Sequence, residues 1–174
     1  MRRVRLSWPH NDDNTGLGSD CKHCSQPETL THVFYTCEPA AGLWTSVFKL
    51  LAAYCKEPAL VPSARAVMSG IIARDLWLKV GKPDRVRAAS VWRTIRAIAL
   101  VAIRDARNRL YHDDKDYTAA ALFFSWRREV VGVIYRAELH PQGGGVGETV
   151  GRWLHNRVFA RRSDDGDLIV RIQP

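Results

Sequence analysis

The 174-residue sequence lacks any run of about 18 uncharged apolar residues, the minimum for a membrane-spanning helix. Its most apolar stretch, residues 95–103, contains Arg96 and is followed by Arg104. The basic N-terminus, residues 1–9, lacks the apolar core of a secretory signal peptide. We therefore expect no membrane association and an intracellular protein, nuclear or cytoplasmic, whose thiols stay reduced.

Complete catalytic motifs are also lacking. The glycines at 143–147 lack the Lys-Ser/Thr of a phosphate-binding loop, and the aspartates at 164–167 lack EF-hand spacing. The Lys82-Pro83-Asp84 triplet is similar to the Pro-Asp of some metal-dependent endonucleases, but a helical segment follows it instead of a strand. Residues 111–114 match the Tyr-x-Asp-Asp pattern of polymerases, yet they follow a helix and indicate a helix-ending turn. We expect no enzyme.

Cysteine is scarce but clustered. Three of the four cysteines lie close together with a histidine, in the spacing Cys-x2-Cys-x7-His-x4-Cys. In a reducing compartment this clustering indicates metal ligation rather than disulfides. The predicted ligands of one structural zinc ion are Cys21, Cys24, His32 and Cys37, which leave no open coordination position.

Two alternatives stay open for the ligand set. His23 lies inside the Cys-x2-Cys turn and is a possible ligand, and Cys55 is a possible replacement for His32 in a four-cysteine site. His32 and Cys37 are five positions apart, so they reach the same side of a helix only if the helix end is distorted.

Apolar residues recur at helical spacing through most of the chain, which predicts a mainly α fold. We expect a helical stretch from about Thr29, followed by helices over residues 39–55, 63–78, 85–112 and 117–139. The linker at 57–62, the Gly81–Asp84 turn and the 113–116 turn separate the later helices. In the 85–112 helix, the inward stripe comprises Val91, Trp92, Ile95, Ile98, Ala99, Ala102, Ile103, Ala106 and Leu110. In the 117–139 helix it comprises Phe123, Trp126, Val130, Ile134 and Ala137. The 39–55 helix has an apolar stripe of Leu43, Trp44, Val47, Phe48, Leu51 and Tyr54.

The predicted organisation has four parts. Residues 1–20 are an irregular lead-in, 21–56 the zinc-binding module with its following helix, and 57–140 a helical domain. Residues 141–174 combine a Gly-rich linker, a short helix near 148–156 and a β-hairpin. The hairpin turn is expected at 163–166, between apolar segments at 158–160 and 168–172.

The segment from Cys21 to Val47 resembles the zinc-binding region that follows the polymerase domain in reverse transcriptases of LINE-type, non-LTR retrotransposons. The resemblance is carried by the cysteines and histidine, a Glu28-Thr29 pair and a Leu43-Trp44 pair; it covers about residues 20–50. A weaker likeness lies at 106–108. The resemblance implies an accessory domain of an element-encoded polyprotein that helps to hold nucleic acid. Since a polymerase needs several hundred residues, we expect a detached C-terminal fragment or a domesticated remnant.

The net charge of +8 favours polyanionic partners. Residues 81–112 carry eight basic side chains against two acidic ones, a net +6. On the side of this helix opposite the apolar stripe, we expect Arg93, Arg96, Arg104 and Arg107 to bind the phosphates of RNA or DNA. The alternatives are a domesticated protein-interaction domain that binds a host or element-encoded protein and, third, an endonuclease remnant.

Overall fold

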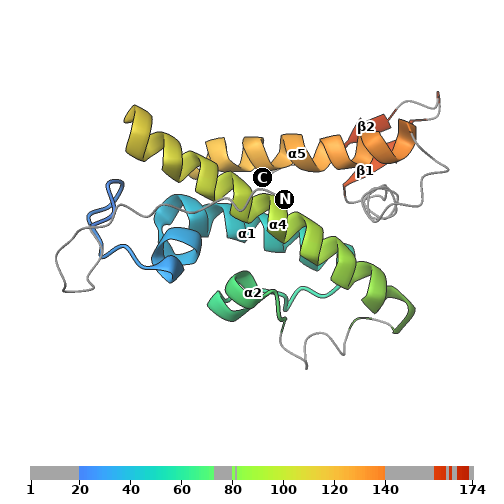
Figure 1. The fold of residues 1–174 in the computed structure, drawn as a ribbon. Helices are drawn as coiled ribbons and strands as arrows, with labels where there is room; N and C mark the ends of the chain where they lie inside the picture. The colour runs from blue at the N-terminus through green and yellow to red at the C-terminus, as the bar shows by residue number, and fades with distance from the viewer. Residues whose placement is uncertain are drawn as a thin grey trace, which may run out of the picture.

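The chain is mainly helical in the residues that its computed structural model describes, which are 20–72, 80, 82–139, 159–163, 165 and 168–172. Figure 1 shows how the elements are arranged in space. In chain order the elements are the π-helix η1 (His32–Thr36), the helices α1 (Glu38–Cys55), α2 (Ala64–Ser69), α4 (Lys82–Asp113) and α5 (Ala119–Leu139), and the strands β1 (Ala160–Arg162) and β2 (Leu168–Val170). The predicted lead-in and the predicted short helix near 148–156 lie outside the described residues.

The core is formed where α1, α4 and α5 pack against one another (Figure 1). The predicted inward stripe of α4 is buried except for Ile98, which is partly exposed. On α5 the predicted stripe is buried in full: Phe123, Trp126, Val130, Ile134 and Ala137. Cys21 and Cys37 belong to the same buried cluster as these helices. The segment that contains the four predicted ligands, residues 21–37 (the metal-ligating segment), therefore shares one core with the helical domain.

Three tryptophans are fully or almost fully buried, and each indole N–H donates to a backbone carbonyl. Trp44 donates to Phe34 at 2.6 Å, Trp92 to Gly70 at 2.8 Å and Trp126 to Ile95 at 2.9 Å. Burying an unpaired donor costs free energy, so these bonds allow large rings to fill the core. They also tie α1 to η1, α4 to the end of α2, and α5 to α4.

The helix α2 is much shorter than predicted. It begins after Ser63, whose Oγ accepts the N–H of Ala66 at 3.1 Å, and it ends at Ser69 instead of near residue 78. Gly70 follows with a φ of 76°, a left-handed conformation that glycine adopts without strain and that ends helices. The predicted end at 78 was wrong because Gly70 stops the helix.

The helix α4 begins earlier than predicted, at Lys82 rather than Arg85. The predicted Gly81–Asp84 turn is therefore wrong beyond its first residue. Pro83 is compatible with a first helical turn because the N–H that proline lacks has no intrahelical partner there. Asp84, also in that turn, complements the positive end of the helix dipole.

The other end of α4 confirms that Tyr111, His112 and Asp113 form the last turn of a helix. Asp114 follows with a φ of 50° and reverses the chain. The helix α5 then begins at Ala119, two residues later than predicted, after Thr118, whose Oγ1 accepts the N–H of Ala121 at 3.1 Å. The chain therefore turns after an acidic helix end, as predicted, but only Asp114 lies in the turn, because residues 111–113 still belong to the helix.

Near the C-terminus, β1 and β2 pair antiparallel, with Ala160 opposite Val170 and Arg162 opposite Leu168. Of the segment between them, only residues 163 and 165 are described, so a predicted hairpin turn is not established. Among the described helices, none combines the length and apolarity needed to cross a membrane.

Two helical glycines provide a matched test of the packing. At Gly42 in α1, an added Cβ would lie 2.6 Å from the Cβ of Ala119, whereas at Gly132 in α5 it would meet only the flexible end of Arg136. We predict that Gly42→Ala lowers the free energy of unfolding by about 1–3 kcal/mol through overpacking. Gly132→Ala should raise it by about 0.5–1 kcal/mol, because alanine favours helix interiors.

Urea unfolding followed by circular dichroism measures both changes. Adding Ala119→Gly to Gly42→Ala should recover part of the stability, since it removes the clashing methyl group. Equal effects of the two glycine substitutions would contradict the close approach of α1 and α5.

Candidate metal centre

The Cys-x2-Cys segment forms a tight turn closed by backbone hydrogen bonds. The N–H of Cys21 donates to Gln26 at 2.8 Å, and the carbonyl of Cys21 accepts from Cys24 at 3.3 Å and from Ser25 at 2.7 Å. Ser25 has a φ of 56°, which turns the chain back so that Pro27 pairs with Asp20. The turn presents the two cysteines to the same side.

The distortion expected between His32 and Cys37 is a π-helical turn. In a regular α-helix, residues five apart differ in direction by about 140°. Here the N–H of Cys37 donates to the carbonyl of His32 at 2.8 Å, the i to i+5 bond of a π-helix. Single π turns are found frequently at functional sites, and this one places both side chains on the same side.

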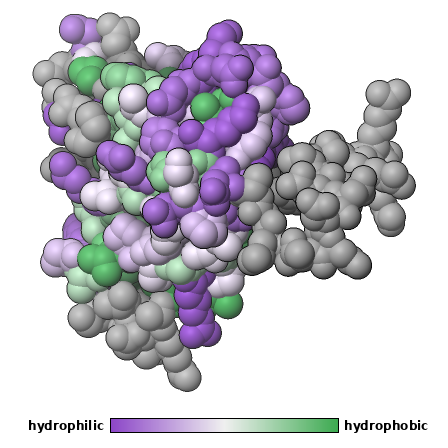
Figure 2. All heavy atoms as spheres, turned by 90° about the vertical axis from the view of Figure 1, so that its left-hand side faces the viewer, coloured by the Kyte–Doolittle hydropathy of each residue, from purple (hydrophilic) through white to green (hydrophobic). Residues whose placement is uncertain are grey.

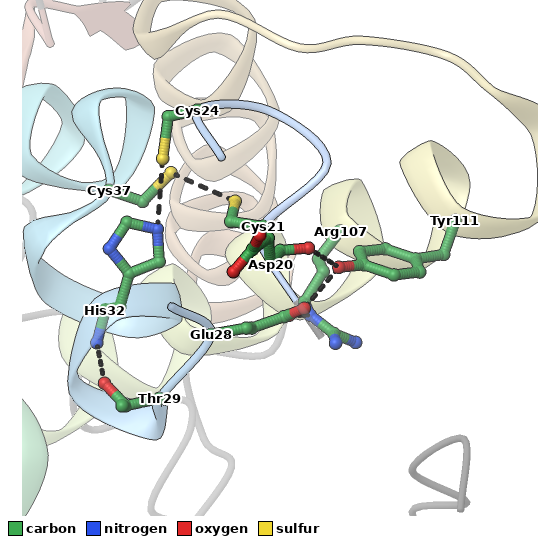
Figure 3. A network of polar contacts seen from close by, with 9 residues as sticks. All are labelled: Asp20, Cys21, Cys24, Glu28, Thr29, His32, Cys37, Arg107 and Tyr111. Atoms are coloured by element: carbon green, nitrogen blue, oxygen red, sulfur yellow. Dashed lines mark hydrogen bonds and ion pairs between the residues drawn. The ribbon is translucent and has the colours of Figure 1, made fainter. Parts of the chain in front are cut away.

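All four predicted ligands meet. One ligand atom from each of Cys21, Cys24, His32 and Cys37 lies within 4.8 Å of the other three. Cys21 Sγ is 4.0 Å from Cys37 Sγ, and Cys24 Sγ is 3.2 Å from His32 Nε2. Figure 3 shows these side chains converging from the Cys-x2-Cys turn and the π turn. The group is compatible with a metal ion and is largely buried.

Neighbouring hydroxyls fix the position of His32. Its backbone N–H donates to Thr29 Oγ1 at 3.0 Å, and Thr36 Oγ1 lies 3.3 Å from its Nδ1. A hydrogen bond at one ring nitrogen of a histidine leaves the other free to face a metal ion, and here it is Nε2 that faces the cysteines. Thr36 thus gives the His32 ring the kind of partner that histidine ligands usually have, and Thr29 holds the His32 backbone.

Burial, followed by the neighbouring Cys21 and Cys24, raises the pKa of Cys37 well above its usual range. Three thiolates are unfavourable together in an apolar site unless a cation compensates their charge. A bound metal ion reverses this preference, because a coordinating thiol is deprotonated. Cys37 is also the N-cap residue of α1, where the helix dipole favours negative charge.

The two alternative ligands lie elsewhere. His23 Nδ1 is 2.7 Å from Asp116 Oδ1, and its ring stacks on Tyr117 with centroids 5.6 Å apart. Cys55 is the last residue of α1, whereas Cys37 comes directly before the first residue of the same helix. A helix of this length is about 27 Å long, so Cys55 lies far from Cys37. Neither belongs to the cluster found among the described residues.

A buried ionic group, absent from the sequence prediction, fastens the metal-ligating segment to α4. The Glu28 carboxylate accepts hydrogen bonds from Arg107 Nε and the Tyr111 hydroxyl, as Figure 3 shows. The Glu28 side chain is 4 % exposed and that of Arg107 15 %. The Arg107 guanidinium also lies 4.4 Å from the centre of the Tyr111 ring. No local signal predicts these partners, which are about 80 residues apart in the sequence.

Two further ion pairs join the Cys-x2-Cys turn to the connection between α4 and α5. Lys22 Nζ lies 3.1 Å from Asp114 Oδ1, and His23 pairs with Asp116. The bond to His23 lowers the pKa of the Asp116 carboxyl. The charge of Lys22, which follows Cys21 directly, is therefore paired with Asp114. Both contacts lie next to the ligand cysteines, so the metal-ligating turn and the 114–117 connection support each other.

The four arginines predicted to bind nucleic acid do not form one free basic face. Arg96 donates from Nε to Val67 and from Nη2 to Met68, both at 2.6 Å, and so caps the end of α2. Burial lowers its pKa. Arg107 binds Glu28. Both guanidinium groups are therefore engaged inside the protein.

The other two arginines reach the surface. Arg93 is exposed, and its Nε donates to Ala89 of its own helix at 3.3 Å. Arg104 pairs with the adjacent Asp105 at 2.7 Å, which offsets its charge. Sequence spacing placed all four on one side of α4, but it could not show that α2 and the Cys-x2-Cys segment cover that side.

Comparison with known proteins identifies no relative of this chain: no family model, curated protein or solved structure matches it. The resemblance to retrotransposon reverse transcriptases therefore depends on the motifs from Cys21 to Val47 and, more weakly, on residues 106–108.

Breaking the buried ionic group should destabilise the protein strongly. We predict that Arg107→Met lowers the free energy of unfolding by about 3–5 kcal/mol, because it leaves the Glu28 carboxylate buried without its cation. The double variant Glu28→Met, Arg107→Met should recover much of this stability, since neither charge then remains. Chemical unfolding of wild type, the double variant and both single variants, Glu28→Met and Arg107→Met, measures the coupling.

Arg104→Met is the matched control, because it removes an arginine of the same helix from an exposed pair. It should change stability by less than about 1 kcal/mol. Equal destabilisation by Arg104→Met and Arg107→Met would contradict a structural role for the Glu28 group.

Proposed function

We propose that Cys21, Cys24, His32 and Cys37 bind one structural zinc ion. The observation that carries this proposal is the convergence of three sulfurs and one imidazole nitrogen within 4.8 Å. In a tetrahedral site with Zn–S bonds of about 2.3 Å, two sulfurs lie about 3.8 Å apart, close to the 4.0 Å between Cys21 and Cys37. Soft thiolates together with imidazole favour zinc over hard cations such as magnesium and calcium.

The role of this zinc is structural rather than catalytic. Four protein ligands fill a tetrahedral shell and leave no position for water or substrate. The ligands come from two short segments, and the ion would hold the Cys-x2-Cys turn against the start of α1. This turn has little apolar surface of its own to bury. A bound metal would therefore supply the stability that a hydrophobic core supplies in larger units.

We further propose that the chain is a non-catalytic accessory domain, similar to the zinc-binding region of LINE-type reverse transcriptases, and that it binds RNA or DNA. Three residues of the resemblance have roles around the cluster: Thr29 binds the backbone of His32, Glu28 binds α4, and Trp44 binds η1. The net charge of +8 supports a polyanionic partner. Arg96 and Arg107 are engaged inside the protein, so the helix face predicted from the sequence does not by itself provide the binding surface.

A protein-interaction domain is the second candidate, favoured by an apolar hollow of about 660 Å³ beside α1. Its wall includes Phe48, Leu60 and the exposed Val61, and Lys49 and Lys56 border it. These charges suit an acidic, amphipathic segment of a protein partner. The endonuclease alternative has less support, because Pro83 and Asp84 lie in the first turn of α4 and not on a strand.

Metal analysis of the purified protein tests the zinc proposal. We predict about one zinc per chain, absent from Cys21→Ser and from Cys37→Ser. Removing the metal with a chelator should lower the free energy of unfolding by about 4 kcal/mol or more, the value for a ligand present at a thousand times its dissociation constant.

Cys55→Ser is the matched control, because Cys55 is the only cysteine outside the cluster. It should keep its zinc and its stability. In the zinc-loaded protein we expect Cys55 alone to react with a thiol reagent, and slowly, since burial raises its pKa to about 11. Metal content well below one per chain, or a loss of zinc in Cys55→Ser, would refute the proposed ligand set.

A further inference from the structure

A second hollow, of about 640 Å³, lies where α4 ends and α5 begins. Its wall includes Arg109, Lys115, Tyr117, Phe124, Ser125 and Arg128. We propose that this hollow is the nucleic-acid site, and that it binds a single strand by holding phosphates on its basic side chains and stacking a base on Phe124. The inference deepens the proposed function by locating the surface, and it differs from the helix face that the sequence predicted.

The cations of this hollow are available, unlike Arg96 and Arg107. Arg109 and Lys115 are exposed, and neither side chain has an ion pair or hydrogen bond within the described part of the chain. Arg128 is 77 % exposed and lies 3.3 Å from Glu129, a surface pair that is easily exchanged for a phosphate. Asp116 is the one carboxylate in the wall, and its Oδ1 lies 2.7 Å from His23 Nδ1. The hollow is therefore net positive.

Phe124 gives the hollow a feature that favours an unpaired base. Its side chain is 60 % exposed, although it lies one position from the buried Phe123, whose ring meets it edge to face at 6.4 Å between centroids. An aromatic ring held at a basic surface is a platform on which any base stacks. The bases of a duplex are already stacked on one another, so a single strand is the better ligand.

Figure 2 views the molecule from the end at which α4 stops and α5 starts. Hydrophilic residues dominate the upper right of this face. Arginine and lysine side chains around one aromatic ring suit a strand with phosphates and bases.

The metal-ligating turn supports one wall of this hollow. Lys115, Asp116 and Tyr117 come from the connection that Lys22 and His23 hold by ion pairs and ring stacking. Lys22 and His23 lie between the ligands Cys21 and Cys24. Zinc would therefore organise the wall without contacting the nucleic acid.

Binding of labelled single-stranded RNA and DNA of about 12 nucleotides, measured by fluorescence anisotropy over a salt series, tests the site. The slope of log affinity against log salt is negative. In the double variant Arg109→Ala, Arg128→Ala it should be less steep than in wild type, by about 0.7 for each phosphate that the protein no longer neutralises. Phe124→Ala should weaken binding about tenfold, whereas Phe124→Tyr should retain it. A duplex of the same sequence should bind more weakly than the single strand.

The matched control is Arg93→Ala, Arg104→Ala, which removes equal charge from the other accessible arginines of α4. An unchanged slope in this control supports the hollow. An equal or larger decrease in the control, or equal binding by Phe124→Ala and wild type, would overturn it. So would competition by polyglutamate as effective as that by RNA, since it would point to an acidic peptide.

Metal content, measured on the same variants, separates this inference from the zinc proposal. The hollow variants should all keep zinc, because none of their substituted residues touches the cluster. If the protein contains zinc but the hollow variants bind nucleic acid as wild type does, only this inference is refuted. If the variants show the predicted binding pattern but the protein contains no zinc, only the zinc proposal is refuted.

Discussion

The convergence of Cys21, Cys24, His32 and Cys37 is the constraint around which the N-terminal half of the structure is arranged. It requires a reversed turn at Ser25 and a π turn after Thr31, neither of which is a favoured conformation without support. Both unusual conformations place ligand atoms, and α1 begins directly after the last ligand. The position of α1 in the core is therefore tied to the geometry of the cluster.

The sequence predicted those parts that depend on local periodicity and spacing. The inward stripes of α1, α4 and α5 follow from apolar residues recurring along each helix, and the ligand set follows from the cysteine and histidine spacing. Helix boundaries were less accurate where one residue decides them. Gly70 ended α2 early, and Pro83, interpreted as a turn residue, is tolerated in the first turn of α4.

Long-range partners could not be predicted from the sequence. Glu28 lies about 80 residues from Arg107 and Tyr111, and Arg96 caps a helix whose end was itself misplaced. A helical projection shows which residues share a side, but the neighbours packed on that side decide whether it faces solvent. For this reason the count of arginines on α4 overstated the basic surface of that helix.

The arginines of α4 fall into two groups, those whose hydrogen bonds stabilise the fold and those whose guanidinium groups remain at the surface. Where a guanidinium meets a buried carboxylate or a row of carbonyls, its hydrogen bonds are used within the protein, and exchanging them for phosphate would leave those partners unpaired. Where a guanidinium contacts only water or a neighbouring surface carboxylate, a phosphate can replace that partner with little change in the free energy of unfolding. By this criterion, Arg107 belongs to the attachment of the metal-ligating segment. Arg109, two residues further along the same helix, belongs to the basic hollow between α4 and α5 that we propose as the nucleic-acid site.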